Sequence, residues 1–474
     1  MANAETPRHS APKASSLGSL PSDATRVDLA TNEGASGVVA DPRALGSQLV
    51  RRTKPGRHRP FLQKHPWVHA HALMPAESDF RGQDTLASES TLGELAQVRP
   101  VQLQDHDGNF LAYGVENVQS KLRLRLYSFE PDRPVTLDLV RHRLRQAISR
   151  RRITGPCHPE GGERLVYSEA DGLSGLIIDR YAECLGIQFT AAALLPWGED
   201  IIDAAVQLAS EHGTPVKHVF CRVDESTAKM EAISPQHREM IGAWQRGAGN
   251  AVASDADASN RIWYRHNGYE MAVDLDQGQK TGGYLDQQQN QAAASEYCRG
   301  RNVLDVCCYT GGFSLAAAGA GARSVTGIDG SDVALQAARA NAERNGFQNV
   351  EFVRGDCFED LKQRGKAGER FEVVIVDPPR FAGNRHQIKS ALRAYTRLNA
   401  LAIDLIPTGG ILVTCSCSGR VGMDEFRDAV RLAADRRRRG LTLLETRGAP
   451  PDHPVSLDCP ETQYLKCLIL QVSG

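Results

Sequence analysis

The chain lacks several features that would assign its class at once. No apolar run approaches the roughly 20 residues that a membrane-spanning helix needs, and the N-terminus has no short apolar core of a secretory signal. The 11 cysteines are spaced irregularly and form no pair of CxxC motifs, which argues against a structural zinc site and a secreted disulfide framework. The GxGxxG pattern that cradles a dinucleotide pyrophosphate is also absent. These absences predict a reduced cytoplasmic protein with no membrane span, no metal and no nicotinamide cofactor.

Charge of one sign is not in excess either. The formal net charge is −1, which excludes a uniformly basic coat for nucleic acid. The cationic residues nevertheless gather in three clusters, which are Arg51, Arg52, Lys54, Arg57 and Arg59, then Arg141, Arg143, Arg145, Arg150, Arg151 and Arg152, and finally Arg436 to Arg439. Such clusters either follow a phosphate backbone or form a solvated helix face, and the sequence leaves both interpretations open.

The 474 residues are enough for two or three domains. Residues 1–47 are rich in Ala, Ser, Pro and Gly and predict a disordered leader. Residues 48–130 contain short alternating runs broken by Gly and Asp, which indicate a small β-rich domain. Residues 135–245 alternate helix and strand patterns and predict a compact α+β middle domain. A small, polar stretch at 245–260 is typical of a linker and separates this domain from a last one at 261–474.

The last domain alternates strand and helix patterns. Strands are predicted at 301–308, 324–329, 350–354, 371–377, 409–415, 441–446 and 464–472. Helices are predicted at 312–320, 331–345, 386–406 and 423–438, with a shorter one after Asp356. This alternation predicts a doubly wound parallel sheet, and the short loop between the last two strands makes them antiparallel. An α/β sheet of this kind, with one reversed strand at its C-terminal end, is typical of S-adenosylmethionine-dependent methyltransferases.

The first strand–loop–helix unit of this sheet runs from Val303 to Phe313 and contains a tight glycine turn at Gly311. Glycine lets the backbone approach a ligand closely at the carboxyl end of the strand. Methyltransferases usually carry an acidic residue followed by glycines at alternate positions. Asp305 and Gly311 fit that pattern, whereas Cys307 and Tyr309 replace the other two glycines.

Four aspartates stand near the carboxyl ends of successive predicted strands: Asp305, Asp329, Asp356 and Asp377. A single aspartate in such a place is often only a helix cap or a turn former. Four on one ligand-binding edge favour a cofactor site instead. Asp329 is then placed to accept the ribose hydroxyls of the cofactor, and Asp356 to accept the adenine amino group.

Several motifs together resemble bacterial 23S rRNA cytosine-5 methyltransferases of the RlmI type, from about residue 50 to the C-terminus. The motifs are Gly278-Gln279-Lys280-Thr281-Gly282, Leu285-Asp286-Gln287, Tyr309-Thr310-Gly311-Gly312-Phe313, Asp377-Pro378-Pro379, Ser416-Cys417-Ser418, Asp452-His453-Pro454 and Tyr464-Leu465-Lys466. Lys54-Pro55-Gly56-Arg57-His58 and His65-Pro66-Trp67-Val68 resemble the start of the PUA domain of that family, and Glu169 to Tyr181 resembles its middle domain. Two positions depart from the pattern, because Gln288 stands where the family commonly has arginine and Arg380 where it often has lysine.

The resemblance implies a thiol mechanism centred on Cys417. Carbon 5 of cytosine is too poor a nucleophile to attack a methyl donor, whereas a cysteine that adds to carbon 6 makes it enamine-like. Cys415 lies on the same face of the strand, so spacing alone does not choose between the two; Cys417 is favoured because it lies nearer the loop. Its reactivity requires nearby positive charge or dipoles. Asp377 is implied to hydrogen-bond the cytosine and is also able to accept a proton.

The remaining site residues follow from the same comparison. The predicted contacts to S-adenosylmethionine are Lys280, Thr281, Gln287, Asp305, Tyr309, Thr310, Gly311, Asp329, Asp356 and Asp377. The predicted RNA contacts are Arg51, Arg52, Lys54, Arg57 and Arg380. His453 is interpreted either as a functional residue that positions RNA or acts as a base, or equally as a structural histidine, and Tyr395 and Lys466 are weaker candidates for substrate contact. The expected partner is 23S rRNA or an assembling large-subunit particle, and the resemblance is compatible with a homodimer.

Two other functions compete with cytosine-5 methylation. One is methylation of a base nitrogen, which needs no cysteine. The other is an RNA-binding assembly factor whose cofactor pocket is vestigial, against which the intact row of four aspartates speaks.

Overall fold

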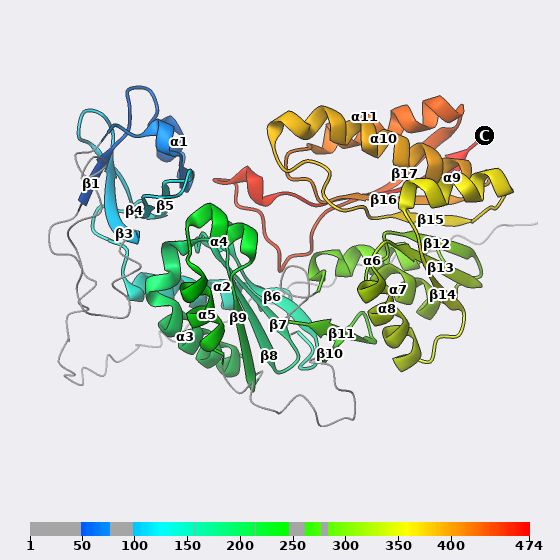
Figure 1. Cartoon of the computed structure of the whole chain (residues 1–474), viewed down its shortest axis with the longest axis horizontal. Helices are drawn as coiled ribbons and strands as arrows, with labels where there is room; N and C mark the ends of the chain where they lie inside the picture. Colours follow the sequence, from blue (N-terminus) through cyan, green and yellow to red (C-terminus); the bar gives the residue numbers. More distant parts are fainter. Residues whose placement is uncertain (1–48, 76–97, 156, 214, 246–260, 276–282) are drawn as a thin grey trace, which may run out of the picture. The chain divides into compact units, whose positions relative to one another are not determined.

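The computed structural model describes residues 49–75, 98–155, 157–213, 215–245, 261–275 and 283–474, so the predicted leader lies outside the described residues. Among these residues, four β-sheets of five, four, two and seven strands are present (Figure 1). No helix in the described ranges is both long enough and apolar enough to cross a membrane.

The first sheet has the strand order β1-β3-β4-β5-β2. Its elements are β1 (Leu49–Arg52), α1 (Arg59–Leu62), β2 (Trp67–Val68), β3 (Val98–Gln104), β4 (Phe110–Asn117) and β5 (Leu124–Ser128). β1 is parallel to β3, and the other neighbouring strands are antiparallel. The alternate residues Val101 and Leu103 of β3 pack with Leu124 and Leu126 of β5 in one apolar core, which is the period-2 pattern of a half-buried strand.

The second sheet has the order β6-β7-β8-β9, in which only β8 and β9 are parallel. This part of the chain consists of α2 (Leu137–Arg151), β6 (Gly162–Tyr167), β7 (Leu176–Tyr181), β8 (Cys184–Phe189), α3 (Gly198–Glu211), β9 (His218–Arg222), α4 (Glu225–Glu231) and α5 (Pro235–Ala243). Thr136 begins α2 as an N-cap, because its side chain accepts a hydrogen bond from the backbone N–H of Leu139. The result is the α+β arrangement that the sequence predicts.

Three of the six arginines in the second basic cluster have a structural role in this region. Arg151 is buried and donates to both carboxylate oxygens of Asp171 at 2.7 Å. Arg152 donates to Glu163 at 2.8 and 2.9 Å, and Arg143 donates to two backbone carbonyls. Buried or partly buried cations need such partners, so the side chains at 143, 151 and 152 tie α2 and its C-terminal end to neighbouring segments, and these contacts occupy their guanidinium groups.

A hairpin of β10 (Arg261–His266) and β11 (Tyr269–Asp274) precedes the large sheet. This hairpin is not among the strands that are predicted from the sequence. Asn267 and Gly268 form its two-residue turn with φ values of 51° and 87°. Asn-Gly between alternating residues is a strong hairpin signal, because both positions of the turn need a positive φ.

The seven-stranded sheet has the order β14-β13-β12-β15-β16-β18-β17. Its strands are β12 (Asn302–Val306), β13 (Ser324–Asp329), β14 (Val350–Arg354), β15 (Val373–Val376), β16 (Ile411–Ser416), β17 (Gly440–Arg447) and β18 (Lys466–Ser473). Its helices are α6 (Gln288–Ser295), α7 (Gly312–Gly319), α8 (Asp332–Arg344), α9 (Cys357–Ala367), α10 (Ile388–Asp404) and α11 (Met423–Arg437). β12 to β16 pair in parallel, and β18 is antiparallel to both β16 and β17. The predicted wound sheet with one reversed last strand is therefore confirmed.

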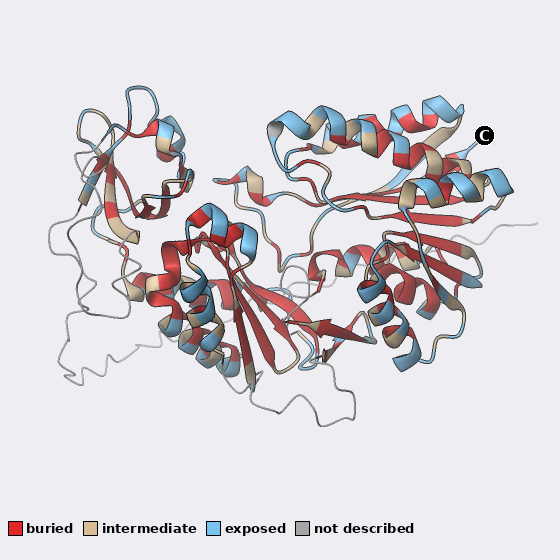
Figure 2. Cartoon of the chain, in the orientation of Figure 1, coloured by how far each residue is buried: buried red, intermediate tan, exposed pale blue. Residues whose placement is uncertain are grey.

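Helices cover both faces of this sheet (Figure 1). Leu304, Val374 and Leu412 pack against the core of α9, α10 and α11, whereas Val303 and Ile375 pack against that of α6 and α7. Strands buried on both faces are near-continuous apolar runs, and Figure 2 shows them buried along their length. The polar residues at the strand ends are consequently the ones that remain for binding.

Candidate active site

Three aspartates stand at the carboxyl ends of strands β13, β14 and β15 of the large sheet. Asp329 ends β13, Asp356 precedes α9 just after β14, and Asp377 directly follows β15. Asp305 lies one residue before the end of β12, level with Gly327 of β13 and Ile375 of β15. The strands are parallel, so the structure places all four near one edge, which is where wound sheets bind ligands.

The loop between β12 and α7 has an unusual backbone. Cys307, Tyr309 and Gly311 all have positive φ, at 63°, 50° and 87°. Cys307 and Tyr309 are the positions at which the usual methyltransferase pattern has glycine, so the loop keeps the glycine conformation with other side chains in place. Such residues cost of order 1–3 kcal/mol each and persist at ligand-binding turns. At Gly311, a Cβ would lie 3.0 Å from Leu315 and 3.1 Å from Phe352, so this position also has little room.

Asp305 is fully buried beneath this loop. Its Oδ2 accepts a hydrogen bond from the Ser314 hydroxyl at 2.6 Å, and its Oδ1 has no hydrogen-bond partner within the described part of the chain. Burial raises the pKa of Asp305 to about 7, even though the Ser314 hydrogen bonds oppose that shift. A buried carboxylate oxygen without a partner is costly, and a cationic ligand group would satisfy it.

Asp329 and Asp356 hold the backbone around the same edge. Asp329 accepts from the backbone N–H of Tyr309 through Oδ2 at 3.0 Å and from that of Ser331 through Oδ1 at 2.9 Å. Asp356 is the N-cap of α9, and its Oδ1 accepts from two backbone N–H groups at 3.0 Å. The cap uses a single oxygen, so the cap role and the predicted adenine contact are compatible in one side chain.

Cys417 is the first residue after β16, and it is partly exposed. Its Sγ lies 3.9 Å from the carbonyl oxygen of Pro378, directly after Asp377. Cys415 is fully buried instead, opposite Cys467 of β18 and inside the apolar core. Strand alternation puts both side chains on the same face of the sheet. They differ in burial, because Cys415 is fully buried, whereas Cys417 is partly exposed at the carboxyl end of β16.

Tyr395 supports the Cys417 loop from below. This fully buried side chain comes from α10, and its hydroxyl lies 2.9 Å from the Ser416 hydroxyl and 3.0 Å from that of Ser418. Burial raises the pKa of Tyr395, and the nearby Cys417 and Asp377 add to the shift. The sequence suggests Tyr395 as a substrate contact, whereas its burial gives it the role of positioning both neighbours of Cys417.

Lys466 supports the same loop from β18. Its buried Nζ donates to the backbone carbonyls of Ser418, Val421 and Tyr464 at 2.7–2.8 Å. Burial lowers the pKa of Lys466 to about 8, and Cys417 opposes that shift. An ammonium group in electrostatic range of the thiol favours the thiolate, which is the nucleophilic form.

Tyr284 is a site residue that sequence reasoning misses. Its ring lies edge-on to Tyr309 with centroids 4.9 Å apart. Burial raises its pKa, as do Tyr309, Asp377 and Cys417, so Tyr284 lies among the residues of the predicted site. The available signal is its place directly before Leu285-Asp286-Gln287. Gln287 of that motif is buried and accepts a hydrogen bond from Asn290 at 2.7 Å.

The other predicted contacts to the cofactor and the RNA differ in their exposure, and two of them lie outside the described residues. Lys280 and Thr281 lie outside the described residues. Thr310 is partly exposed, and its carbonyl accepts from Asn341 at 2.9 Å. Arg380, two residues after Pro378, is exposed.

The predicted RNA contacts of the first sheet also divide. Arg52, Lys54 and Arg57 are exposed as expected. Arg51 is buried and forms an ion pair with the buried Glu116 at 3.0 Å. Its alternation with Arg52 on β1 explains the difference, because successive strand residues face opposite sides. The structure therefore places Arg51 in the interior and leaves it no surface for RNA.

His453 is buried, and its Nδ1 lies 2.9 Å from Asp452. The second carboxylate oxygen of Asp452 accepts from the backbone N–H of Arg164, and its carbonyl accepts from Arg151. Of the two interpretations that the sequence leaves open, these contacts favour the structural one.

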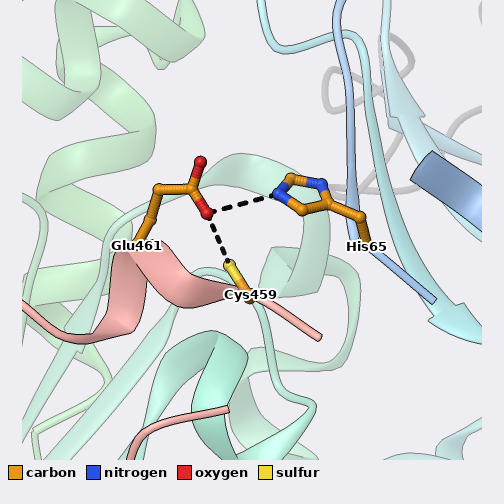
Figure 3. Close-up of side chains that lie close together, drawn as sticks. All are labelled: His65, Cys459 and Glu461. Atoms are coloured by element: carbon orange, nitrogen blue, oxygen red, sulfur yellow. Dashed lines mark hydrogen bonds and ion pairs between the residues drawn. The ribbon is translucent and has the colours of Figure 1, made fainter. Parts of the chain in front are cut away.

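His65, Cys459 and Glu461 form a cluster with metal-ligand chemistry (Figure 3). The Nε2 of His65 lies 3.3 Å from Glu461, and the thiol of Cys459 lies 3.7 Å from the same carboxylate oxygen. The Nδ1 of His65 accepts the backbone N–H of Trp67, which leaves the ring proton on Nε2, where it points at Glu461. Burial raises the pKa of the Cys459 thiol to about 12, so the thiol is a donor as well. Hydrogen bonding to Glu461 accounts for this arrangement without an ion.

Comparison with known proteins gives two family matches. The family model of an S-adenosylmethionine-dependent methyltransferase matches residues 232–471, and that of a PUA-like domain matches residues 52–129. Ribosomal RNA large subunit methyltransferase I of Shewanella denitrificans is 33% identical over 423 residues, which cover 89% of this chain and 98% of the relative. The protein of that name from Photobacterium profundum is 34% identical over 414 residues, or 87% and 96%.

Solved structures show the same fold. A structure assigned as a SAM-dependent methyltransferase of Streptococcus mutans aligns with a TM-score of 0.69 at 17% identity, and the alignment covers 90% of this chain and all of that one. A methyltransferase structure in complex with SAH aligns with the same TM-score and coverage at 18% identity.

Proposed function

The chain belongs to the family of S-adenosylmethionine-dependent methyltransferases that includes ribosomal RNA large subunit methyltransferase I, and from that membership we propose that it methylates carbon 5 of a cytosine in large-subunit ribosomal RNA. The observation that carries the proposal is the position of Cys417. A partly exposed thiol stands at the tip of β16, beside the carbonyl that follows Asp377. Methylation of a ring or exocyclic nitrogen needs no thiol there.

The residues around the loop fit the cofactor. The unpartnered Oδ1 of Asp305 suits the ammonium group of the methionine end, and Asp329 and Asp356 suit the ribose and the adenine. Tyr309, Thr310 and Gly311 form the loop whose backbone would lie against the cofactor. We assign Gln287 to the same cofactor site, together with Lys280 and Thr281, which lie outside the described residues. S-adenosylmethionine, when bound, supplies an electrophilic methyl group.

The chain's own residues carry the remaining chemistry. The Cys417 thiolate adds to carbon 6, so an S–C6 bond forms and the electron pair of the C5–C6 double bond becomes available at carbon 5. Carbon 5 takes the methyl group and then loses its proton to a base. Loss of that proton returns the electron pair to the ring and expels the Cys417 thiolate. We assign the hydrogen bond to the cytosine ring, and the ability to accept a proton, to the carboxylate of Asp377, which directly precedes the Pro378 carbonyl 3.9 Å from the Cys417 Sγ.

Of the predicted RNA contacts, only the residues with exposed side chains are assigned to RNA binding in this proposal. Arg52, Lys54 and Arg57 of the PUA-like domain are exposed, as is Arg380, three residues after Asp377, and arginine suits phosphate and folded RNA. A target cytosine within structured RNA has to leave its stack, which costs least where it is unpaired.

The first test is to incubate the protein with a 23S rRNA transcript and isotope-labelled S-adenosylmethionine, and then to analyse the nucleosides by mass spectrometry. We expect the label in 5-methylcytidine. A label in an N-methylated nucleoside would contradict the thiol mechanism and leave Cys417 a packing role. A ribosomal-subunit preparation treated in the same way is the matched substrate, and absence of label in both would contradict the proposed activity.

Cofactor binding should depend on pH through Asp305. Burial raises its pKa to about 7, so the cofactor-free protein holds Asp305 protonated below that pH, and only the deprotonated form attracts an ammonium group. We expect the affinity for S-adenosylmethionine to rise about tenfold between about pH 6 and pH 8. Calorimetric titration at several pH values measures it, and Asp305→Asn should remove the dependence. An affinity of the wild type that does not change with pH would contradict this role.

The raised pKa of Asp305 also affects stability. Its effect on the free energy of unfolding is opposite in sign to that of a salt-bridged aspartate, whose pKa is lowered. The pKa in the folded protein lies above the ordinary 3.8, so the folded state holds a proton that the unfolded state has lost. The free energy of unfolding of the cofactor-free protein therefore loses the Asp305 contribution as pH rises from about 4 to about 7. Cofactor binding and stability then move in opposite directions over the upper part of this range.

A further inference from the structure

A basic hollow lies where α9, α10 and α11 meet, on the face of the large sheet that these three helices cover. Its volume is about 470 Å³, and its charged lining consists of Lys362, Arg393, Arg397, Arg436 and Arg437. Each of these five side chains is exposed. The hollow thus brings together the third basic cluster of the sequence and cations from two other helices.

The carboxylates nearby compensate only part of this charge. Lys362 pairs with Glu359 at 3.3 Å, and Arg437 pairs with Asp404 at 3.1 Å. The guanidinium of Arg397 lies 5.0 Å from the ring centre of Phe358 and has no carboxylate partner within the described residues. Arg393 and Arg436 likewise have neither an ion pair nor a hydrogen bond with any described residue. Three guanidinium groups therefore face one hollow with no anion of their own.

The helix dipole accounts for only some of these cations. Arg436 and Arg437 end α11, where a positive charge is favoured by the carbonyl ends of the helix. Arg393 and Arg397 lie inside α10, one helical turn apart, and Lys389 lies one turn before them. Like charges at i and i+4 destabilise a helix, by about 0.2–0.5 kcal/mol per pair. This row of three has no acid between its members, so its positive charge is open to an anion from outside the chain.

We propose that this hollow binds the phosphate backbone of the ribosomal RNA substrate, as a second contact surface apart from the PUA-like domain. The inference rests on the proposed function, because that function supplies the RNA. Arginine donates to phosphate in a planar fork, and the two unpartnered guanidinium groups of Arg393 and Arg436 come from different helices on the rim of one hollow. A row on α10 that continues to Lys389 suits an extended polyanion better than a single small anion. Phosphate contacts of this kind position RNA and do not read its sequence.

The test compares RNA binding by the full chain and by an Arg393→Gln/Arg436→Gln variant. Binding of a 23S rRNA transcript is measured by filter retention between about 50 and 200 mM salt, where each phosphate contact adds roughly 0.7–0.9 to the slope of log affinity against log salt. We expect the variant to bind at least about tenfold more weakly at about 0.1 M salt, with the slope reduced by about 1.4–1.8. An Arg393→Lys/Arg436→Lys variant should keep the slope, because it keeps the charge.

The matched control is Arg427→Gln/Arg431→Gln on α11. These arginines are also exposed, but they pair with Asp424, Asp428 and Asp435, so the same change in net charge should leave affinity and slope close to the wild type. S-adenosylmethionine binding, unchanged in every variant, reports an intact fold.

The outcomes separate this inference from the proposed function. Wild-type protein that binds and methylates the transcript, together with an Arg393/Arg436 variant of unchanged slope, would overturn the hollow as an RNA site and leave the methylation intact. The variant could instead bind ribosomal subunits more weakly than the wild type while it binds the naked transcript equally well. That result would assign the hollow to a contact with a ribosomal protein and would also overturn the RNA site. Wild-type protein that neither binds nor methylates either substrate would overturn both.

Discussion

Replacement of Cys417 by serine should reduce methyl transfer to carbon 5 by at least about a thousandfold. A serine hydroxyl stays protonated at neutral pH and adds poorly to carbon 6, whereas the thiol has the Lys466 ammonium in electrostatic range. The Tyr395 hydroxyl also fixes the hydroxyls of both neighbours of Cys417, Ser416 and Ser418. The change leaves the loop backbone in place. The rate is measured in a single turnover with isotope-labelled S-adenosylmethionine, and the affinity for the cofactor should remain that of the wild type.

Cys415→Ser is the matched control. It makes the same chemical change two residues earlier, in a fully buried side chain that packs against Cys467. It should cost stability, by about 1–3 kcal/mol, because a polar hydroxyl replaces the thiol inside an apolar core, and it should keep most of the activity. Formation of 5-methylcytidine by the Cys417→Ser protein, or loss of activity only in the Cys415→Ser protein, would contradict the assignment of the nucleophile.

The wound sheet could be predicted because its signals are local. The central strands contain short apolar runs such as Val373–Val376, which Asp377 and Pro378 follow directly, and such runs separated by amphipathic helices allow little else. The hairpin at 261–274 escapes prediction although Asn267-Gly268 is a strong turn signal. Its first strand breaks the polarity pattern at two positions, because Trp263 stands on the less buried side and His266 on the buried side, so the alternation is weak.

The basic clusters show what a sequence alone does not distinguish. Arg51 and Arg52 are neighbours in one charged run, yet one is buried against Glu116 and the other is exposed. The partner of Arg51 lies two strands away in the sheet, so no local pattern marks it. The same holds for Arg151, whose partner Asp171 follows the next strand.

The candidate site likewise contains residues that could be predicted from the sequence and residues that could not. The aspartates at the strand ends could be predicted, because a strand end is a local feature. Tyr284 and the supporting role of Lys466 could not, because both depend on segments far apart in the chain. Lys466 begins β18, and only the antiparallel pairing of Lys466 with Ser416 brings it beneath Cys417. The depth that separates Cys415 from Cys417 likewise comes from packing against β18 rather than from spacing.

Replacement of Asp377 by asparagine should lower the rate of methyl transfer by about 10²–10⁴, the range typical for loss of a positioned acid or base. The carboxylate directly follows β15, its backbone N–H is fixed to the Val306 carbonyl at 3.1 Å, and its charge contributes to the raised pKa of both Tyr284 and Tyr395. Asparagine keeps the size of the side chain and its carbonyl oxygen but removes the charge and the ability to accept a proton. The effect should therefore appear in kcat, with a smaller change in KM.

Asp356→Asn provides the contrast that separates catalysis from cofactor binding. Asparagine is as good an N-cap as aspartate, so α9 should remain intact, while the proposed contact to the adenine amino group loses its charge. We expect this variant to raise the KM for S-adenosylmethionine and to leave kcat near that of the wild type. If Asp377→Asn also changed only the KM for the cofactor, its carboxylate would belong to the binding set alone. The proton from carbon 5 would then have to leave through another group, and the partly exposed Tyr284, which faces the same site, would be the next residue to change.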